Sequence, residues 1–268
     1  MLKLSSLAAF GAIAVALSAS IPAASAAPIL TNRYSFTNGA TDSIGGADLT
    51  LVGTTTVAGG QLVLPGGFHT NYAAATGSSL TTLSNTVTGA SAITIEMWFT
   101  DEQAGASYSK VFMAGSGGAS RFIDVTPRKF GSYNSQEFSI NGEVDNFLSI
   151  VPTSAPYYFA ASFDTATNLM TMHAGAVGGA LVSKSASMGG YTLAGLGPLS
   201  YFALGYSAFN DPDFKGSIDE MRVWNGAFSA QNAAYDFAAG ANSIPEPSSF
   251  LLMGLGLAAL VMRKRKQN

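Results

Sequence analysis

The chain has no cysteine and only two histidines among its 268 residues. Without cysteine it can form no disulfide and has no thiol nucleophile, so a domain of this size must depend on burial or on bound ions for its stability. His69 and His173 are far apart in the sequence, and neither has a histidine neighbour. A zinc site therefore lacks its usual ligands, and we expect both histidines at strand edges or in turns.

Positive charge is also scarce in the central part of the chain. Residues 27–243 contain eight lysines and arginines against fifteen aspartates and glutamates, which gives a net charge of −7. Nucleic acids and anionic membrane surfaces are bound through concentrated positive charge. This composition therefore argues against both kinds of partner.

The apolar segment near the C-terminus is short for a membrane span. It runs from Phe250 to Met262, which would be about 20 Å as a helix against about 30 Å of bilayer hydrocarbon. A docked core helix is one interpretation. The position favours a membrane segment, because four basic residues follow at once and such residues hold the end of a span on the cytoplasmic side.

Pro245, Glu246 and Pro247 interrupt the chain before the apolar segment. The basic residues after the segment are Arg263, Lys264, Arg265 and Lys266. This ending resembles the PEP-CTERM sorting signal of Gram-negative bacteria that build extracellular polysaccharide. The resemblance implies that an exosortase, a membrane-embedded protease, acts near Pro-Glu-Pro. It also implies a precursor held in the inner membrane by residues 243–268 and a mature protein at the cell surface or in the extracellular matrix.

The N-terminus has the organisation of a signal peptide. Lys3 supplies a positive charge, Leu4 to Leu17 is apolar, and Ala24 and Ala26 are the small residues that signal peptidase accepts. We expect cleavage after Ala26, so residues 1–26 are absent from the mature chain. A retained N-terminal membrane anchor is the alternative.

Between the two signals, residues 27–242 are expected to form one all-β domain. Apolar and polar residues alternate over short runs separated by glycine and asparagine, as in Ile93 to Phe99, and roughly a dozen such runs predict an antiparallel two-sheet sandwich. One short helix is predicted from Ala230 to Ala239, capped by Ser229 and ended by Gly240. We also expect Trp98 and Trp224, each on a strongly patterned strand, in the core.

Four of these segments, in order, resemble the laminin G-like, concanavalin A-like jelly roll. They are residues 92–99, 157–164, 169–175 and 214–224. The resemblance implies a fold that hosts lectins, glycan-binding modules, adhesion domains and glycosidases. Function has therefore to be argued from a site.

An enzyme of this fold would need paired carboxylates beside the scissile bond. The nearest candidates are Glu143 and Asp145, but Ile140-Asn141-Gly142 before them is typical of a turn, so we interpret both as solvated loop charges. Glu96 stands alone on its strand and is expected to face solvent. We therefore favour a non-enzymatic surface or matrix protein that binds polysaccharide, with a glycosidase as the alternative.

Asp219 lies in the last of these four segments, residues 214–224, and matches the aspartate that opens the last strand in relatives of this fold. Those relatives often hold a structural calcium ion at this aspartate. The resemblance therefore implies calcium at Asp219, and hard oxygen ligands suit that ion. The alternative is that Asp219 accepts hydrogen bonds or pairs with Arg222. For glycan contact, the candidates are loop tyrosines with amide side chains nearby, namely Tyr72, Tyr133 and Tyr206.

Overall fold

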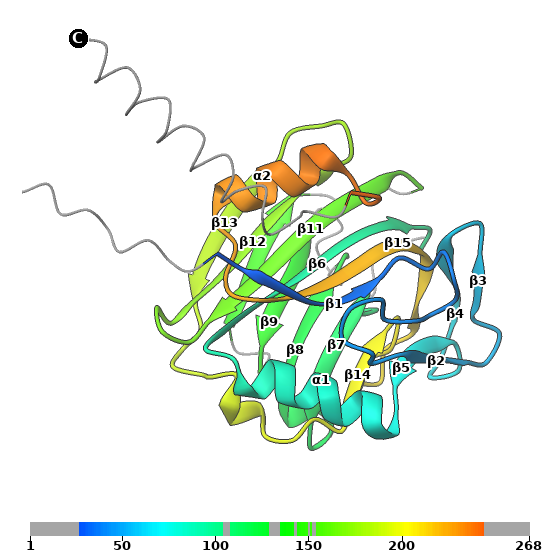
Figure 1. Ribbon diagram of the computed structural model, residues 1–268, viewed down its shortest axis with the longest axis horizontal. Coiled ribbons are helices and arrows are strands. Elements are labelled where there is room, and N and C mark those ends of the chain that lie inside the picture. Colours follow the sequence, from blue (N-terminus) through cyan, green and yellow to red (C-terminus); the bar gives the residue numbers. More distant parts are fainter. Residues whose placement is uncertain are drawn as a thin grey trace, which may run out of the picture.

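The computed structural model describes residues 27–103, 108–128, 135–141, 144–149, 151 and 154–243. In these ranges the chain forms two antiparallel sheets packed face to face (Figure 1). Sheet A has the order β13-β12-β11-β6-β15-β4-β3, with β1 also paired to β15, and sheet B has the order β10-β9-β8-β7-β14-β5-β2. The predicted all-β, concanavalin A-like jelly-roll sandwich is confirmed.

The strands of sheet A are β1 (Ile29–Tyr34), β3 (Thr56–Ala58), β4 (Gln61–Gly67), β6 (Ala92–Asp101), β11 (Pro156–Asp164), β12 (Leu169–Ala176), β13 (Val182–Ser187) and β15 (Asp213–Asn225). Those of sheet B are β2 (Leu49–Val52), β5 (Tyr72–Ala75), β7 (Phe112–Ser116), β8 (Arg121–Thr126), β9 (Ser135–Ile140), β10 (Val144–Ser149) and β14 (Tyr201–Leu204). The helices are α1 (Gly77–Gly89) and α2 (Ala230–Ala239), with 3-10 turns η1 (Gly118–Ser120) and η2 (Ala194–Leu196).

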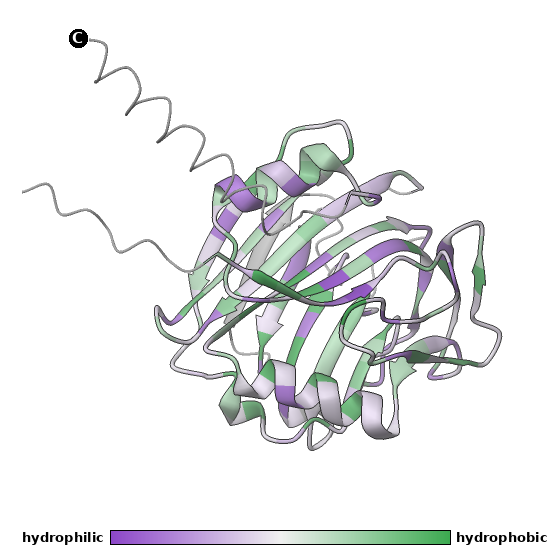
Figure 2. Ribbon diagram, viewed as in Figure 1, coloured by the Kyte–Doolittle hydropathy of each residue, from purple (hydrophilic) through white to green (hydrophobic). Residues whose placement is uncertain are grey.

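The main core lies between the two sheets. Alternate side chains of each strand point inward, as Ile93, Ile95 and Met97 do on β6. Figure 2 shows the same alternation as hydrophobic and hydrophilic bands along the central strands. Burial of this apolar surface, rather than any disulfide, holds the described part of the domain together.

A second apolar cluster covers the outer face of sheet A, where α2 packs across the strands (Figure 1). Trp98 and Trp224 lie here, 3% and 5% exposed, beneath Phe228 and Ala233. Their burial agrees with the prediction, and β6 and β15 are neighbours as expected. They belong, however, to this outer cluster and not to the core between the sheets.

The predicted C-terminal helix begins and ends where the sequence indicates. Ser229 accepts a hydrogen bond from the Asn232 backbone N–H, and the Asn232 side chain reciprocates to the Ser229 backbone. Gly240 follows the last turn with a φ of 81°, a left-handed value that favours glycine.

Five elements were not predicted: α1, β3, β5, β10 and β13. Helix α1 is rich in glycine, serine and threonine, which are weak helix formers, and burial of Leu83 and Val87 stabilises it instead.

Asn141 forms the expected turn between β9 and β10, with a φ of 57°. The interpretation of Asp145 as a loop residue is wrong, because it lies on β10, while Glu143 lies outside the described residues.

Both predicted sorting segments also lie outside the described residues. These are the signal-peptide residues Ala24 and Ala26 and the tail residues Pro245, Glu246, Pro247, Arg263, Lys264, Arg265 and Lys266. Within the described ranges, no helix has the length and apolar character needed to cross a bilayer.

Candidate functional site

Aromatic side chains gather on the outer face of sheet B, where β5 and β14 pair. We define the aromatic cluster as Phe68, His69, Tyr72, Tyr201 and Tyr206. The ring centroids of Tyr72 and Tyr206 are 4.9 Å apart, and Tyr206 also lies 5.4 Å from His69 and 6.2 Å from Tyr201. Phe68 stacks on His69 at 4.7 Å and is 52% exposed. Half-buried tyrosines beside an exposed phenylalanine form a ready contact surface.

The loop between β4 and β5 is held rigidly under these rings. The Asp213 carboxylate accepts backbone N–H bonds from His69, Thr70 and Asn71 at 3.0, 2.8 and 2.9 Å. His69 has a φ of 54°, and its Nε2 lies 2.8 Å from the carbonyl oxygen of Phe209. These bonds fix the rings before any ligand arrives, which lowers the entropy cost of binding.

A buried ion pair lies beneath the loop that carries Tyr206. Lys110 Nζ lies 2.8 Å from Asp124 Oδ2 and donates to Thr126 Oγ1 at 2.8 Å. The Phe209 ring covers the ammonium group at 5.5 Å. Burial alone would lower the pKa of Lys110, but the Asp124 carboxylate more than offsets this and raises it. Lys110 therefore stays charged and paired, so the pair supports the surface from below.

Asp124 and Asp211 on this face have hydrogen-bond donors. Asp124 accepts from Ser139 at 2.6 Å as well as from Lys110, and Asp211 accepts from Ser207 at 3.1 Å. A retaining glycosidase needs two carboxyl groups about 5 Å apart and available to the substrate. Asp124, Asp211 and Asp213 do not offer such a pair, whereas the tyrosine rings and hydroxyls remain accessible. Burial raises the pKa of Tyr206, so its phenol stays protonated as a hydrogen-bond donor.

The structure brings together two of the three tyrosines predicted for glycan contact. Tyr72 and Tyr206 are neighbours, and Tyr133 lies outside the described residues. Sequence reasoning missed Phe68 and Tyr201. Tyr201 is the first residue of β14, which pairs with β5 over more than a hundred residues of sequence, a contact that no local pattern reveals.

Glu96 is not solvent-facing, and that expectation was wrong. Its side chain is fully buried on the outer face of sheet A, because α2 covers this part of the sheet. It accepts hydrogen bonds from Tyr158 Oη at 3.0 Å and Trp224 Nε1 at 2.9 Å, and Arg222 lies 3.4 Å away. Arg222 also donates to Glu220 at 2.7 Å.

This buried network holds more acids than bases. Glu96, Asp236 and Glu220 face only Arg222 and Arg33, whose Nε lies 2.5 Å from Glu220. Burial raises the pKa of Glu96 to about 8, with Arg222 opposing and Asp236 reinforcing the shift. Asp236, which hydrogen-bonds to Glu96, also has a raised pKa because it is buried. One retained proton makes the total charge of the three acids and two arginines zero. Because this network is buried beneath α2, it stabilises the fold and offers no acid–base site to a substrate.

Asp219 stands apart from this network. It lies at a β-bulge between Ile218 and Glu220, half-buried, and burial raises its pKa. The alternative that it pairs with Arg222 is wrong, because Arg222 bonds to Glu96, Glu220 and the carbonyls of Ala241 and Ser243.

The residues around Asp219 fit calcium poorly. Calcium takes six to eight oxygen ligands. The side-chain oxygens lining the space beside Asp219 come from Gln61, Thr100 and Asn242, and the Glu220 oxygens are occupied by arginines. No group of three or more acidic, histidine or cysteine side chains that could hold a metal occurs in the described ranges. Calcium at Asp219 stays a prediction.

Comparison with known families agrees with this architecture. The sequence model of the concanavalin A-like lectin/glucanases superfamily matches residues 74–234, more than half of the chain. The chain belongs to this superfamily. The PEP-CTERM protein-sorting motif matches residues 243–266, which confirms the resemblance at the tail and implies export with a membrane-anchored precursor in a Gram-negative bacterium. No curated protein matches the sequence.

Solved structures share the fold at low sequence identity. Domain 4 of AbnA, an extracellular arabinanase from Geobacillus stearothermophilus, in complex with arabinotriose, is 21% identical with a TM-score of 0.59 and covers 78% of this chain and 98% of that one. The Ruminococcus gnavus sialidase CBM40 bound to α2,3 sialyllactose is 15% identical with a TM-score of 0.45 and covers 56% and 82%. The likeness to the AbnA domain shows a shared fold.

Proposed function

We propose that this protein is an exported, non-enzymatic surface or matrix protein whose jelly roll binds extracellular polysaccharide through the aromatic cluster. The observation that carries the proposal is the fixed arrangement of Tyr72 and Tyr206 beside the exposed ring of Phe68. Sugar rings present C–H faces that pack on such aromatic rings, and their hydroxyls bond to phenol groups. Asp124, Asp211 and Asp213 are engaged with donors inside the protein, which supports binding without cleavage.

Two of the comparisons support the proposal without deciding it. The structure of the AbnA domain holds arabinotriose, so the same fold can bind a sugar chain. The sorting motif belongs to proteins handled by an exosortase, which we propose as the processing partner. Release near Glu246 would leave the jelly roll at the cell surface or in the matrix, where polysaccharide is the available ligand.

A polysaccharide array tests this function. The full-length protein, purified in detergent, is compared with a double variant, Tyr72→Ala with Tyr206→Ala, and with Tyr235→Ala, which changes an exposed tyrosine on α2. Wild type and Tyr235→Ala should be retained on at least one polysaccharide without release of reducing ends, and the double variant should not. Equal retention of all three proteins, or release of reducing ends, would contradict the proposal.

Mass spectrometry of the surface-exposed protein tests the processing step. A C-terminal peptide ending close to Glu246 is expected. A peptide that still contains Leu251 to Val261 would show a permanent anchor, which the short apolar segment makes a weaker alternative.

A further inference from the structure

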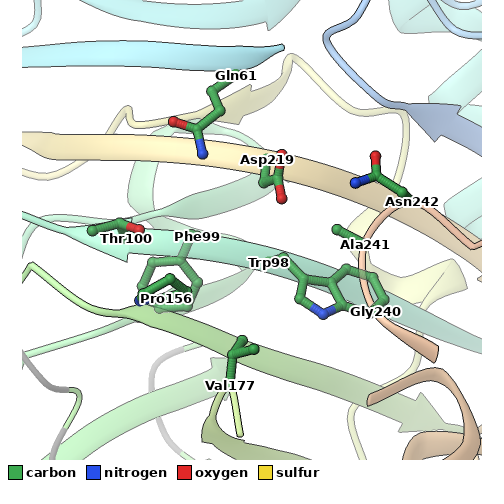
Figure 3. Close-up of a pocket in the computed structure, with 10 residues that line it drawn as sticks. All are labelled: Gln61, Trp98, Phe99, Thr100, Pro156, Val177, Asp219, Gly240, Ala241 and Asn242. Carbon is green, nitrogen blue, oxygen red and sulfur yellow. The ribbon is translucent and has the colours of Figure 1, made fainter. Parts of the chain in front are cut away.

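A pocket of about 230 Å³ opens on the outer face of sheet A, on the opposite side of the sandwich from the aromatic cluster (Figure 3). β6 and β15 form its floor, and the chain that leaves α2 forms one wall. Its polar lining includes Gln61, Trp98, Thr100, Asp219 and Asn242. None of these residues takes part in the proposed glycan surface.

Trp98 brings an unused donor to this pocket. Its Nε1 is buried and has no hydrogen-bond partner, whereas Nε1 of Trp224 donates to Glu96. A buried donor without an acceptor costs about 1–3 kcal/mol, so such groups call for an explanation. The ring cannot easily turn away, because Arg222 lies 4.7 Å from its centre on β15 and Tyr158 lies 4.8 Å from it on β11.

Asp219 brings an unused acceptor. The bulge places an extra residue on β15 opposite Trp98 and Phe99, and bulges of this kind re-aim side chains. The half-buried Asp219 carboxylate has no hydrogen bond or ion pair in the structure. Figure 3 shows the amides of Gln61 and Asn242 on either side of it, and each amide offers both a donor and an acceptor.

We propose that this pocket binds a single sugar ring, as a second carbohydrate site independent of the aromatic cluster. A sugar supplies hydroxyl groups that donate to Asp219 and oxygens that accept from Trp98 Nε1. An anion is excluded by the uncompensated carboxylate, and an apolar ligand would leave both groups unpaired. The volume is below the roughly 300–1,000 Å³ of pockets for drug-sized ligands, which suits one ring rather than a long chain. Sites on opposite faces would let one domain bridge two polysaccharide chains.

The two tryptophans provide the test, because the chain contains no others. Full-length protein labelled with 15N only at tryptophan gives two indole N–H resonances, and Trp98→Phe assigns them. Glucose, galactose, mannose and arabinose are titrated separately to about 100 mM, a range that covers weak, millimolar binding. At least one sugar should shift the Trp98 resonance saturably. The Trp224 resonance should stay in place, because its N–H is already bonded to Glu96.

Two variants make the result specific. Asp219→Asn keeps the size of the side chain and removes its charge, and should weaken the Trp98 titration at least about 5-fold, about 1 kcal/mol. Tyr206→Ala should leave the titration unchanged. If polysaccharide retention fails in the array while the Trp98 shift persists, the proposed function is wrong and this site stands.

Four results would overturn the second site. One is an absence of any Trp98 shift with all four sugars, and another is an equal shift of both resonances. The third is a Trp98 shift produced by calcium chloride, reversed by EDTA and not produced by sugar, which would make the pocket a cation site. Identical titrations of wild type and Asp219→Asn would remove the role assigned to the carboxylate and with it the proposal.

Discussion

The outer faces of the two sheets both bury charged groups but are covered in different ways. On sheet A a helix closes over Glu96, Arg222 and their partners, and a retained proton balances three acids against two arginines. On sheet B a loop lies over the pair of Lys110 and Asp124, and half-exposed aromatic rings rim it. A helix cover suits a stabilising role, whereas a loop on a rigid scaffold suits ligand contact. The difference separates a face that supports the fold from one that presents groups to solvent.

The largest effect is expected on the face closed by the helix. Arg222→Met leaves Glu96 and Glu220 buried without their shared guanidinium, and should lower the free energy of unfolding by about 3–5 kcal/mol. Urea denaturation measures the loss. Lys215→Met on the same strand is the control, because Lys215 is exposed and the change should stay within about 0.5 kcal/mol. If both variants lose a similar free energy of unfolding, the buried charge network is not the source of the stability of this face.

A pH dependence of stability should also arise from this face. Burial raises the pKa of Glu96 from its usual 4.5 to about 8, so the folded state holds a proton that the unfolded state has released. The contribution of Glu96 to the free energy of unfolding should therefore be fully present below pH 4.5 and be lost as the pH rises towards about 8, by about 1 kcal/mol per unit. Glu96→Gln should flatten this slope, and Tyr206→Ala should retain it. If the free energy of unfolding of Glu96→Gln falls with pH as steeply as that of the wild type, the retained proton is not on Glu96.

On the open face, the expected loss is in binding rather than in stability. Tyr206→Ala removes a ring that contacts both Tyr72 and His69, and should weaken binding to the polysaccharide found in the array about 10-fold, about 1.4 kcal/mol. Tyr206→Phe keeps the ring and should lose less. Isothermal titration with soluble polysaccharide compares them. A Tyr206→Phe loss as large as that of Tyr206→Ala would place the interaction in the hydroxyl group.

The smallest effect is expected at Asp219. Its pKa is raised by burial alone, so the charged form is disfavoured in the folded state and Asp219→Asn should stabilise the protein slightly at neutral pH, by less than about 0.5 kcal/mol. EDTA should then leave the melting temperature unchanged. If calcium occupies this position instead, both the substitution and EDTA would lower the melting temperature, because a native-state ligand stabilises by mass action.

The sequence predicts the strands with strong alternation, and it does so for a physical reason. On β6 and β11 every second residue enters the core, so the period of two is visible locally. Helix α1 escapes prediction, because two buried apolar side chains hold weak helix formers in place. The burial of Glu96 escapes it too, since the covering helix comes from more than a hundred residues away.

The candidate site also depends on contacts between residues that are distant in the sequence, which local patterns do not predict. Tyrosines in loops were recognisable as ligand contacts, but the meeting of Tyr72 with Tyr206 depends on the pairing of β5 with β14. The pocket beside Trp98 depends on a bulge and on the path of the chain after α2, and neither has a sequence signature of its own.

The central place of β15 in sheet A has a consequence for the timing of folding. This late strand pairs with β6, β4 and β1, and its Glu220 bonds to Arg33 across 187 residues of sequence. Sheet A therefore stays open in the middle until residues 213–225 have been synthesised, and contacts of such long range form slowly. The sandwich can therefore be completed only once this last strand is available to pair with β6, β4 and β1.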